Sequence, residues 1–168
     1  AVTCTIKTRT QGFPLIRHNV FFSNDYRAEF DALQSGSLNY DPTVYVCAQD
    51  RGDDDAQLHQ SERLLLLVNA PALGDQKSLS DAEIDQCMMR MMRRVEACGL
   101  KIDQMPERRH ITTPQDFNQL FPATGGAIYG RATHGWRATF TRPGVRSTIP
   151  NLYLAGGSVN PGAGIPMA

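Results

Sequence analysis

The sequence predicts an α+β fold in which an antiparallel sheet carries helices on one face. Short segments rich in β-branched or alternating residues predict strands, and longer segments repeat their apolar residues at helical spacing. The two kinds of segment follow the split β-α-β-β-α-β order, with strands at 15–22, 43–48, 63–69 and 107–112. A short helix follows the first strand and a long one, at 80–98, follows the third.

The strands differ in their expected burial. At the start of the chain, Val2, Cys4 and Ile6 alternate with polar residues, which predicts a further, half-buried strand that ends before the break at 11–14. The segment 63–69 contains a run of leucines, which indicates burial on both faces and therefore a central strand.

The long helix has the strongest local signals. Ser80 and Glu83 have the spacing of a capping box, and Gly99 is the expected stop. Ser23 or Asn24 is expected to cap the short helix, in which Tyr26, Phe30 and Leu33 share a face. A third helix should begin at Thr113 and Pro114 and bury Phe117 and Leu120.

The composition excludes several classes of protein. Hydrophobic residues make up 41% and charged residues 20% of the 168 residues, which is ordinary for a globular domain. The 17 basic and 17 acidic residues cancel, so we expect no nucleic-acid partner. The longest apolar run, Leu64 to Val68, is far shorter than the roughly 20 residues that span a bilayer.

Two groups of potential ligands are interpreted as structural. The four cysteines lack the C-x-x-C spacing of redox or zinc sites and are expected to be buried thiols. The three carboxylates at 53–55 lack the alternating spacing and the distal glutamate of a calcium loop, so we expect a solvated loop and no metal site.

The C-terminal stretch has the pattern of a ligand-binding loop. Leu152 to Ala155 form an apolar run of strand length, and Gly156, Gly157 and Ser158 follow at once. Together with Gly162 and Gly164, these glycines leave main-chain N–H groups free to approach a phosphate or a ring oxygen, as a dinucleotide requires. The alternative is a glycine-rich turn that binds no ligand.

Several blocks resemble one known family. The run from Asn151 to Pro166 is similar to the C-terminal flavin signature of bacterial-type carotenoid desaturases, the phytoene desaturase family. Further blocks resemble the same family at 18–26 and 113–117. The blocks at 126–131, 134–136 and 142–144 point to the branch that desaturates hydroxylated or methoxylated neurosporene. One departure is Asn160, where the family usually has histidine.

The resemblance implies an amine-oxidase-like flavoprotein, of which this chain is a C-terminal fragment. Residues 1–112 would be part of the substrate domain, 113–150 a connector, and 151–168 the FAD-binding segment. The N-terminal Rossmann part, which grips the adenosine half of FAD, would be missing, so the fragment alone should be inactive and bind flavin poorly. The cofactor-binding residues implied are Gly156, Gly157, Ser158, Pro161, Gly162, Gly164, Ile165, Pro166 and Met167.

The implied reaction removes two hydrogens from a C–C bond of an acyclic carotenoid, with hydride passing to the flavin. An apolar substrate offers no charged handle, so positioning in a dry cavity should outweigh acid–base catalysis. The usual hydrolase, phosphate-loop and zinc motifs are absent, and no catalytic residue is assigned. Among the scattered histidines, His18 and His134 are the best candidates because they lie in the family-like blocks.

The implied location follows from the substrate. We expect a cytoplasmic protein with peripheral contact to the inner membrane, where a carotenoid resides. Met89 lies off the apolar stripe of the long helix and Met92 lies at its edge, so these side chains either pack against another part of the protein or touch lipid. Two alternatives to a carotenoid desaturase are a flavin amine-oxidase-like enzyme of other specificity and a non-catalytic α+β binding module.

Overall fold

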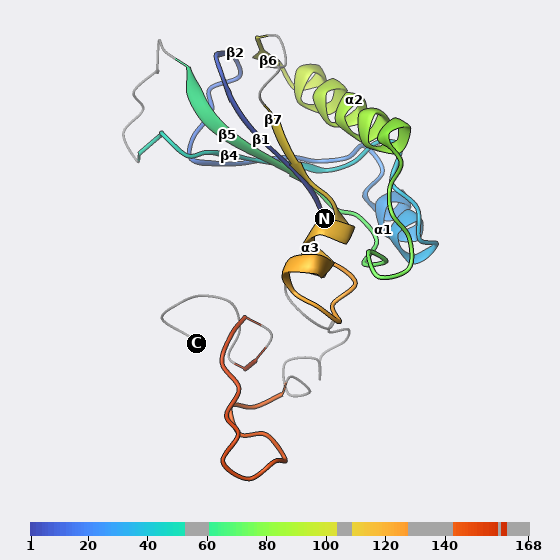
Figure 1. The fold of residues 1–168 in the computed structure, drawn as a ribbon. Helices are drawn as coiled ribbons and strands as arrows, with labels where there is room; N and C mark the ends of the chain where they lie inside the picture. Colours follow the sequence, from blue (N-terminus) through green and yellow to red (C-terminus); the bar gives the residue numbers. More distant parts are fainter. Residues whose placement is uncertain (53–60, 104–108, 128–142, 158, 161–168) are drawn as a thin grey trace. The chain divides into compact units, whose positions relative to one another are not determined.

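The computed structural model describes residues 1–52, 61–103, 109–127, 143–157 and 159–160 (Figure 1). The chain forms two compact units, Ala1–Gly126 and Ala127–Ala168, and each is described by itself. The predictions for residues 53–55, for His134 and for the parts of the family-like blocks that fall within 128–142 lie outside the described residues.

The first unit is built on a five-stranded antiparallel sheet with the strand order β3-β4-β5-β1-β7. Its strands are β1 (Val2–Thr8), β3 (His18–Phe21), β4 (Val44–Ala48), β5 (Glu62–Val68) and β7 (Arg109–Thr112). The fold is therefore α+β with an antiparallel sheet, as predicted. The four strands of the predicted β-α-β-β-α-β order correspond to β3, β4, β5 and β7. The further strand at the start of the chain, β1, lies inside the sheet between β5 and β7.

One face of this sheet forms the core. Cys4 on β1 lies opposite Leu66 on β5 and Ile111 on β7, and Leu66 lies opposite Val46 on β4. These residues alternate along their strands and contribute to one hydrophobic core, in which Cys4, Val46 and Leu66 are fully buried. The central position predicted for the leucine run is confirmed, although Leu65 and Leu67 on its other face are only half-buried.

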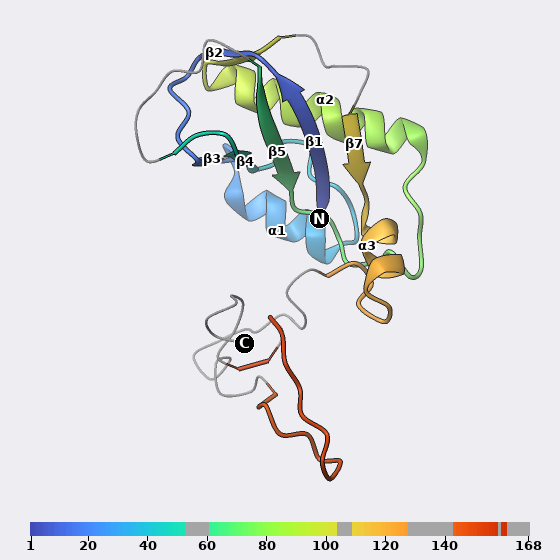
Figure 2. The same cartoon turned by 60° about the vertical axis from the view of Figure 1, so that its left-hand side comes forward.

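Helix α2 (Asp81–Ala97) covers this core, and Figures 1 and 2 show it running along the sheet. Met91 and Val95 are fully buried in the same hydrophobic cluster as the strand residues. The predicted capping box is confirmed, because the Ser80 side chain accepts from the Glu83 N–H and the Glu83 carboxylate accepts from the Ser80 N–H. Gly99 ends the helix with a φ of 90°, in the left-handed region.

Helix α1 (Tyr26–Gln34) begins one or two residues later than expected. Asp25, and neither Ser23 nor Asn24, is the N-cap, and its carboxylate accepts from the Ala28 N–H. The buried residue of this helix is Glu29, which accepts hydrogen bonds from the Thr43 N–H and the Asn69 side chain, at 3.1 Å each. Glu29 thus attaches α1 to the start of β4 and the end of β5.

Helix α3 (Pro114–Leu120) begins as predicted, because Thr113 and Asp116 form a second capping box with Pro114 at the first turn. The expected burial of Leu120 is wrong, since its side chain is 67% exposed. Phe117 is half-buried. The helix has seven residues, about two turns.

Two short strands were not predicted. In a second sheet, β2 (Thr10–Gly12) pairs with β6 (Leu100–Ile102), and Gly12 lies opposite Leu100. The expected break at 11–14 therefore contains a strand, and the strand expected at 15–22 is shortened to His18–Phe21. A strand of three residues is too short to show the alternation of polar and apolar residues that identifies a strand, and the glycine in β2 weakens the pattern further.

Candidate functional site

The described part of the C-terminal unit is a hairpin-like loop. The Leu154 N–H donates to the Val145 carbonyl at 2.7 Å, and the Ser147 N–H donates to the Leu152 carbonyl at 3.2 Å. Arg146 and Tyr153 form an isolated antiparallel bridge between these bonds. The segment 145–154 is thus folded back on itself before the glycine-rich run begins.

The tip of this hairpin is closed by local hydrogen bonds. The Ser147 hydroxyl accepts from the Ile149 N–H at 3.0 Å and donates to the Ile149 carbonyl at 3.1 Å. The Leu152 N–H also reaches the Ile149 carbonyl, and Asn151 takes a left-handed φ of 64°. Asparagine tolerates this conformation better than most residues, which explains its place at the turn.

The predicted buried strand at Leu152 to Ala155 is wrong within the described chain. Leu152 is 45% and Tyr153 is 64% exposed, and the segment makes only the single bridge at Tyr153. A buried strand needs partners for its main-chain N–H and C=O groups, and the described residues supply a single, short partner segment.

The glycine-rich turn begins directly after this hairpin. Gly156 has a φ of 139°, and a Cβ placed there would meet nothing within 4 Å. The Val159 N–H returns to the Gly156 carbonyl at 3.1 Å, and the Asn160 N–H donates to the Pro143 carbonyl at 2.9 Å. An open main chain at Gly156 fits close approach by a ligand, and Gly157 beside it is half-buried.

The remaining predicted cofactor-binding residues lie outside the described residues. They are Ser158, Pro161, Gly162, Gly164, Ile165, Pro166 and Met167. The structure therefore brings Gly156 and Gly157 together with the hairpin, and the assignment of the whole segment to FAD stays a prediction.

His18, one of the two preferred histidines, lies on β3 beside β4. Its Nδ1 is 2.7 Å from the Tyr45 hydroxyl, and the two rings are stacked with centroids 6.1 Å apart. The imidazole is exposed and belongs to the face of the sheet opposite α2. His134, the other candidate, lies outside the described residues.

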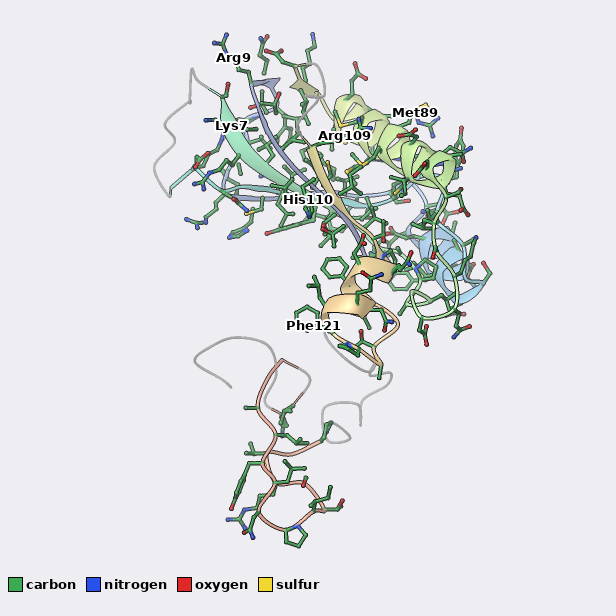
Figure 3. The ribbon with its side chains drawn as sticks, viewed as in Figure 1. Lys7, Arg9, Met89, Arg109, His110 and Phe121 are labelled. Carbon is green, nitrogen blue, oxygen red and sulfur yellow. The ribbon has the colours of Figure 1, made fainter. Side chains whose placement is uncertain are left out.

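This second sheet face is a feature that sequence reasoning missed. Its central row places Thr5 opposite Leu65 and Leu65 opposite Cys47, and His110 and His18 stand at the two ends of the row. Leu65 and Cys47 are half-buried, whereas the two histidines are exposed. Figure 3 marks His110 on β7. The alternation within each strand contained the signal, because each buried core residue is followed by one that faces the other way.

The chain is similar to several carotenoid desaturases. No family model matches the chain. It is 52% identical to the hydroxyneurosporene desaturase of Rubrivivax gelatinosus, over 100% of its own length and 32% of that protein's. Against the hydroxyneurosporene desaturase of Cereibacter sphaeroides it is 40% identical, with 95% of the chain and 32% of the relative covered.

A further relative is the 1-hydroxycarotenoid 3,4-desaturase of a Flavobacterium species, at 32% identity, with 94% of the chain and 33% of the relative covered. The chain is therefore similar over nearly its whole length to carotenoid desaturases, and it spans about a third of the length of these relatives. Among these relatives, its similarity to hydroxyneurosporene desaturases is high over the full chain.

Proposed function

We propose that the chain is part of an FAD-dependent desaturase that removes two hydrogens from a C–C bond of an acyclic hydroxy- or methoxycarotenoid. The observation that carries the proposal is 52% identity to a hydroxyneurosporene desaturase over the whole chain. In this proposal residues 1–112 contribute to the substrate domain, 113–150 connect, and 151–168 contact the flavin. The rest of the desaturase supplies the other FAD-binding part.

The chain's own contribution to the reaction would be positioning. When bound, FAD would accept hydride from the carotenoid. The main chain at Gly156 and Gly157 would hold part of the cofactor, because a Cβ at Gly156 would meet nothing within 4 Å and a ligand can approach the main chain there. The half-buried row around Leu65 and Cys47 offers an apolar surface along which a polyene can lie. No acid or base is needed from this chain for that role.

The substrate experiment separates the three readings of the sequence. Intact desaturase is incubated with phytoene, with a hydroxylated neurosporene and with an amine, and the products are separated by chromatography. We expect turnover of the hydroxylated neurosporene. Turnover of the amine alone would replace the proposal by an amine-oxidase-like activity, and a flavin-free, inactive protein would favour a binding module.

Gly157→Val is expected to abolish flavin retention in the intact protein, because a branched side chain would block approach to the main chain. The measurement is the flavin absorbance per mole of purified protein. Gly144→Val is the matched control, since a Cβ at Gly144 meets nothing within 4 Å and Gly144 lies outside the proposed flavin contacts. Normal flavin content in the Gly157 variant would refute the assignment of this residue.

Peripheral membrane contact forms part of the proposal. None of the helices in the described part of the chain is long and apolar enough to cross a membrane. Met89 is 65% exposed on α2, where Figure 3 labels it, and it lines a surface depression with Tyr40, Arg90 and Arg93. Met92, in contrast, is half-buried against the hydrophobic core.

The two methionines should therefore respond differently to substitution. Met89→Gln is expected to weaken co-sedimentation with liposomes that contain anionic lipid, with little change in melting temperature, because its side chain is free of the core. Met92→Gln should mainly lower the melting temperature. Unchanged liposome binding by the Met89 variant would remove this surface from the proposal.

A further inference from the structure

A cavity lies within the first unit, and all the residues that line it belong to that unit. Its volume is about 220 Å³. Four segments enclose it: the turn at 36–38 after α1, the loop at 70–79 between β5 and α2, the segment 83–90 of α2, and the start of α3. The cavity is smaller than the roughly 300–1,000 Å³ of pockets for drug-sized molecules, so it fits a small ligand.

The walls of this cavity are fixed by close backbone contacts. The Gly74 N–H donates to the Gly125 carbonyl at 2.8 Å, which ties the loop at 70–79 to the segment after α3. A Cβ at Gly74 would lie 2.2 Å from the Pro114 carbonyl oxygen. Inside the loop, the Lys77 N–H donates to the Leu73 carbonyl at 2.8 Å. The cavity is therefore formed before any ligand arrives, and a ligand would not have to order its walls.

One side of the cavity is apolar. Leu38 and Leu79 line it and at the same time pack against the hydrophobic core, which holds their side chains in place. Leu73 completes this side and lies against Gly36, where a Cβ would be 3.1 Å from the Leu73 Cδ1. A short alkyl chain would find a dry surface here.

The polar side carries two cations, of which one is neutralised. The Lys77 Nζ is 2.8 Å from the Glu83 Oε1. The other oxygen of Glu83 accepts from the N–H and the hydroxyl of Ser80, both at 2.9 Å. Lys77 and Glu83 thus compensate one another, and the carboxylate is held by the cap of α2.

Arg90 is the cation without a carboxylate among its contacts in the described part of the chain. Its Nη1 is 3.3 Å from the Asn39 carbonyl oxygen, and its Nη2 is 3.5 Å from the Gln86 Oε1, so both bonds are long. Its guanidinium also lies 5.2 Å from the centre of the Tyr40 ring. The planar guanidinium suits two parallel hydrogen bonds to a carboxylate, and neither of its present partners is charged.

We propose that this cavity binds a small anionic amphiphile, with its alkyl chain against Leu38, Leu73 and Leu79 and its carboxylate on Arg90. The site consists of residues of the first unit, shares none with the proposed flavin contacts, and requires no flavin. A phosphate monoester offers a similar anionic head, and either head could come from a lipid-derived molecule, so the experiment below distinguishes the two.

The test uses the intact desaturase and isothermal titration calorimetry with decanoate, below its micellar concentration. Decyl phosphate, decanol and decylamine form the comparison series. We expect decanoate to bind most tightly and decylamine not to bind. Arg90→Gln should weaken decanoate binding about tenfold or more, because a hydrogen bond to a charged group contributes about 1.5–3 kcal/mol.

Arg93→Gln is the matched control, since Arg93 lies on the same helix, contacts Tyr40 and does not line the cavity. It should bind decanoate within about twofold of the wild type. A series from hexanoate to hexadecanoate needs no mutation: affinity should rise with chain length and level off once the cavity is filled.

Three results would overturn the proposal. One is equal binding of decanoate, decanol and decylamine, and another is unchanged binding by the Arg90 variant. The third is binding to the 168-residue chain but not to the intact protein, which would make the cavity a contact for the rest of the polypeptide. Tighter binding of decyl phosphate than of decanoate would assign the head group to phosphate instead of carboxylate. Flavin content and carotenoid turnover are measured on the same samples, so a failure of the proposed function is recognised separately.

Discussion

Replacing Glu62 by Gln is expected to lower the free energy of unfolding by about 3 kcal/mol, because it leaves a guanidinium without its counter-ion in the interior. Glu62 is 1% and Arg51 is 12% exposed. The Arg51 Nε and Nη2 each lie 2.7 Å from one carboxylate oxygen of Glu62, and the Thr10 hydroxyl donates to the same carboxylate. Arg51 also donates to the Leu15 carbonyl at 2.6 Å, so the pair joins β5 to the loops around β2.

The effect of this pair depends on pH. Burial by itself would raise the pKa of Glu62, but the hydrogen bonds from Arg51 and Thr10 outweigh it and hold the pKa below its usual value of 4.5. A depressed pKa in the folded state stabilises the fold above the unfolded value, and this contribution is lost as the pH falls through the folded value. The difference between wild type and Glu62→Gln should therefore be full at pH 7 and shrink below about pH 4.

The measurement is urea denaturation followed by circular dichroism between pH 3 and pH 8. Asp50→Asn is the matched control, since Asp50 pairs with Arg63 at the surface, where the two side chains are 29% and 60% exposed. Exposed pairs contribute about 0–1 kcal/mol. Equal losses in the two variants at pH 7 would show that burial does not determine the strength of the Glu62 pair.

The second large effect is expected from Gly126→Ala, with a loss of about 3 kcal/mol. Gly126 has a φ of 82°, and a Cβ there would lie 2.2 Å from the Pro114 carbonyl oxygen and 2.7 Å from the Pro114 Cα. The left-handed backbone accounts for about 1 kcal/mol, and overpacking against main-chain atoms that cannot rotate away adds about 1–3 kcal/mol.

Gly99→Ala separates these two contributions. Gly99 has a similar φ of 90°, but a Cβ there would meet nothing within 4 Å. Its substitution should therefore cost only about 1 kcal/mol, the backbone part. Both variants are compared by urea denaturation at one pH. If the two losses are the same, the Gly126 backbone does not pack tightly against Pro114.

Features with local causes were predicted from the sequence. The capping box of Ser80 and Glu83, the apolar stripe of α2 and the stop at Gly99 all act within a few residues, and each was found where expected. The cap of α1 was misplaced because Ser23, Asn24 and Asp25 are all good acceptors, and the choice of Asp25 depends on tertiary contacts of its neighbours.

Features that depend on distant segments could not be predicted. The run at 152–155 looks like a buried strand, yet strand formation depends on neighbouring strands that the described residues do not supply. The amphiphile cavity combines segments from four parts of the sequence, and no single one of them has an unusual composition. The row on the second sheet face becomes visible only when the register of four strand pairs is known.

The position of β1 has a consequence for biosynthesis. This strand pairs with β5 on one side and with β7 on the other, and both partners lie far along the chain. As translation proceeds, both edges of β1 stay without their native partners until β5 has left the ribosome, and one edge stays so until β7 follows. The sheet therefore has a high contact order, and its folding rate should be limited by closing these two long loops. Cells that make this protein have to keep an alternating, half-apolar strand from pairing with other chains during that interval.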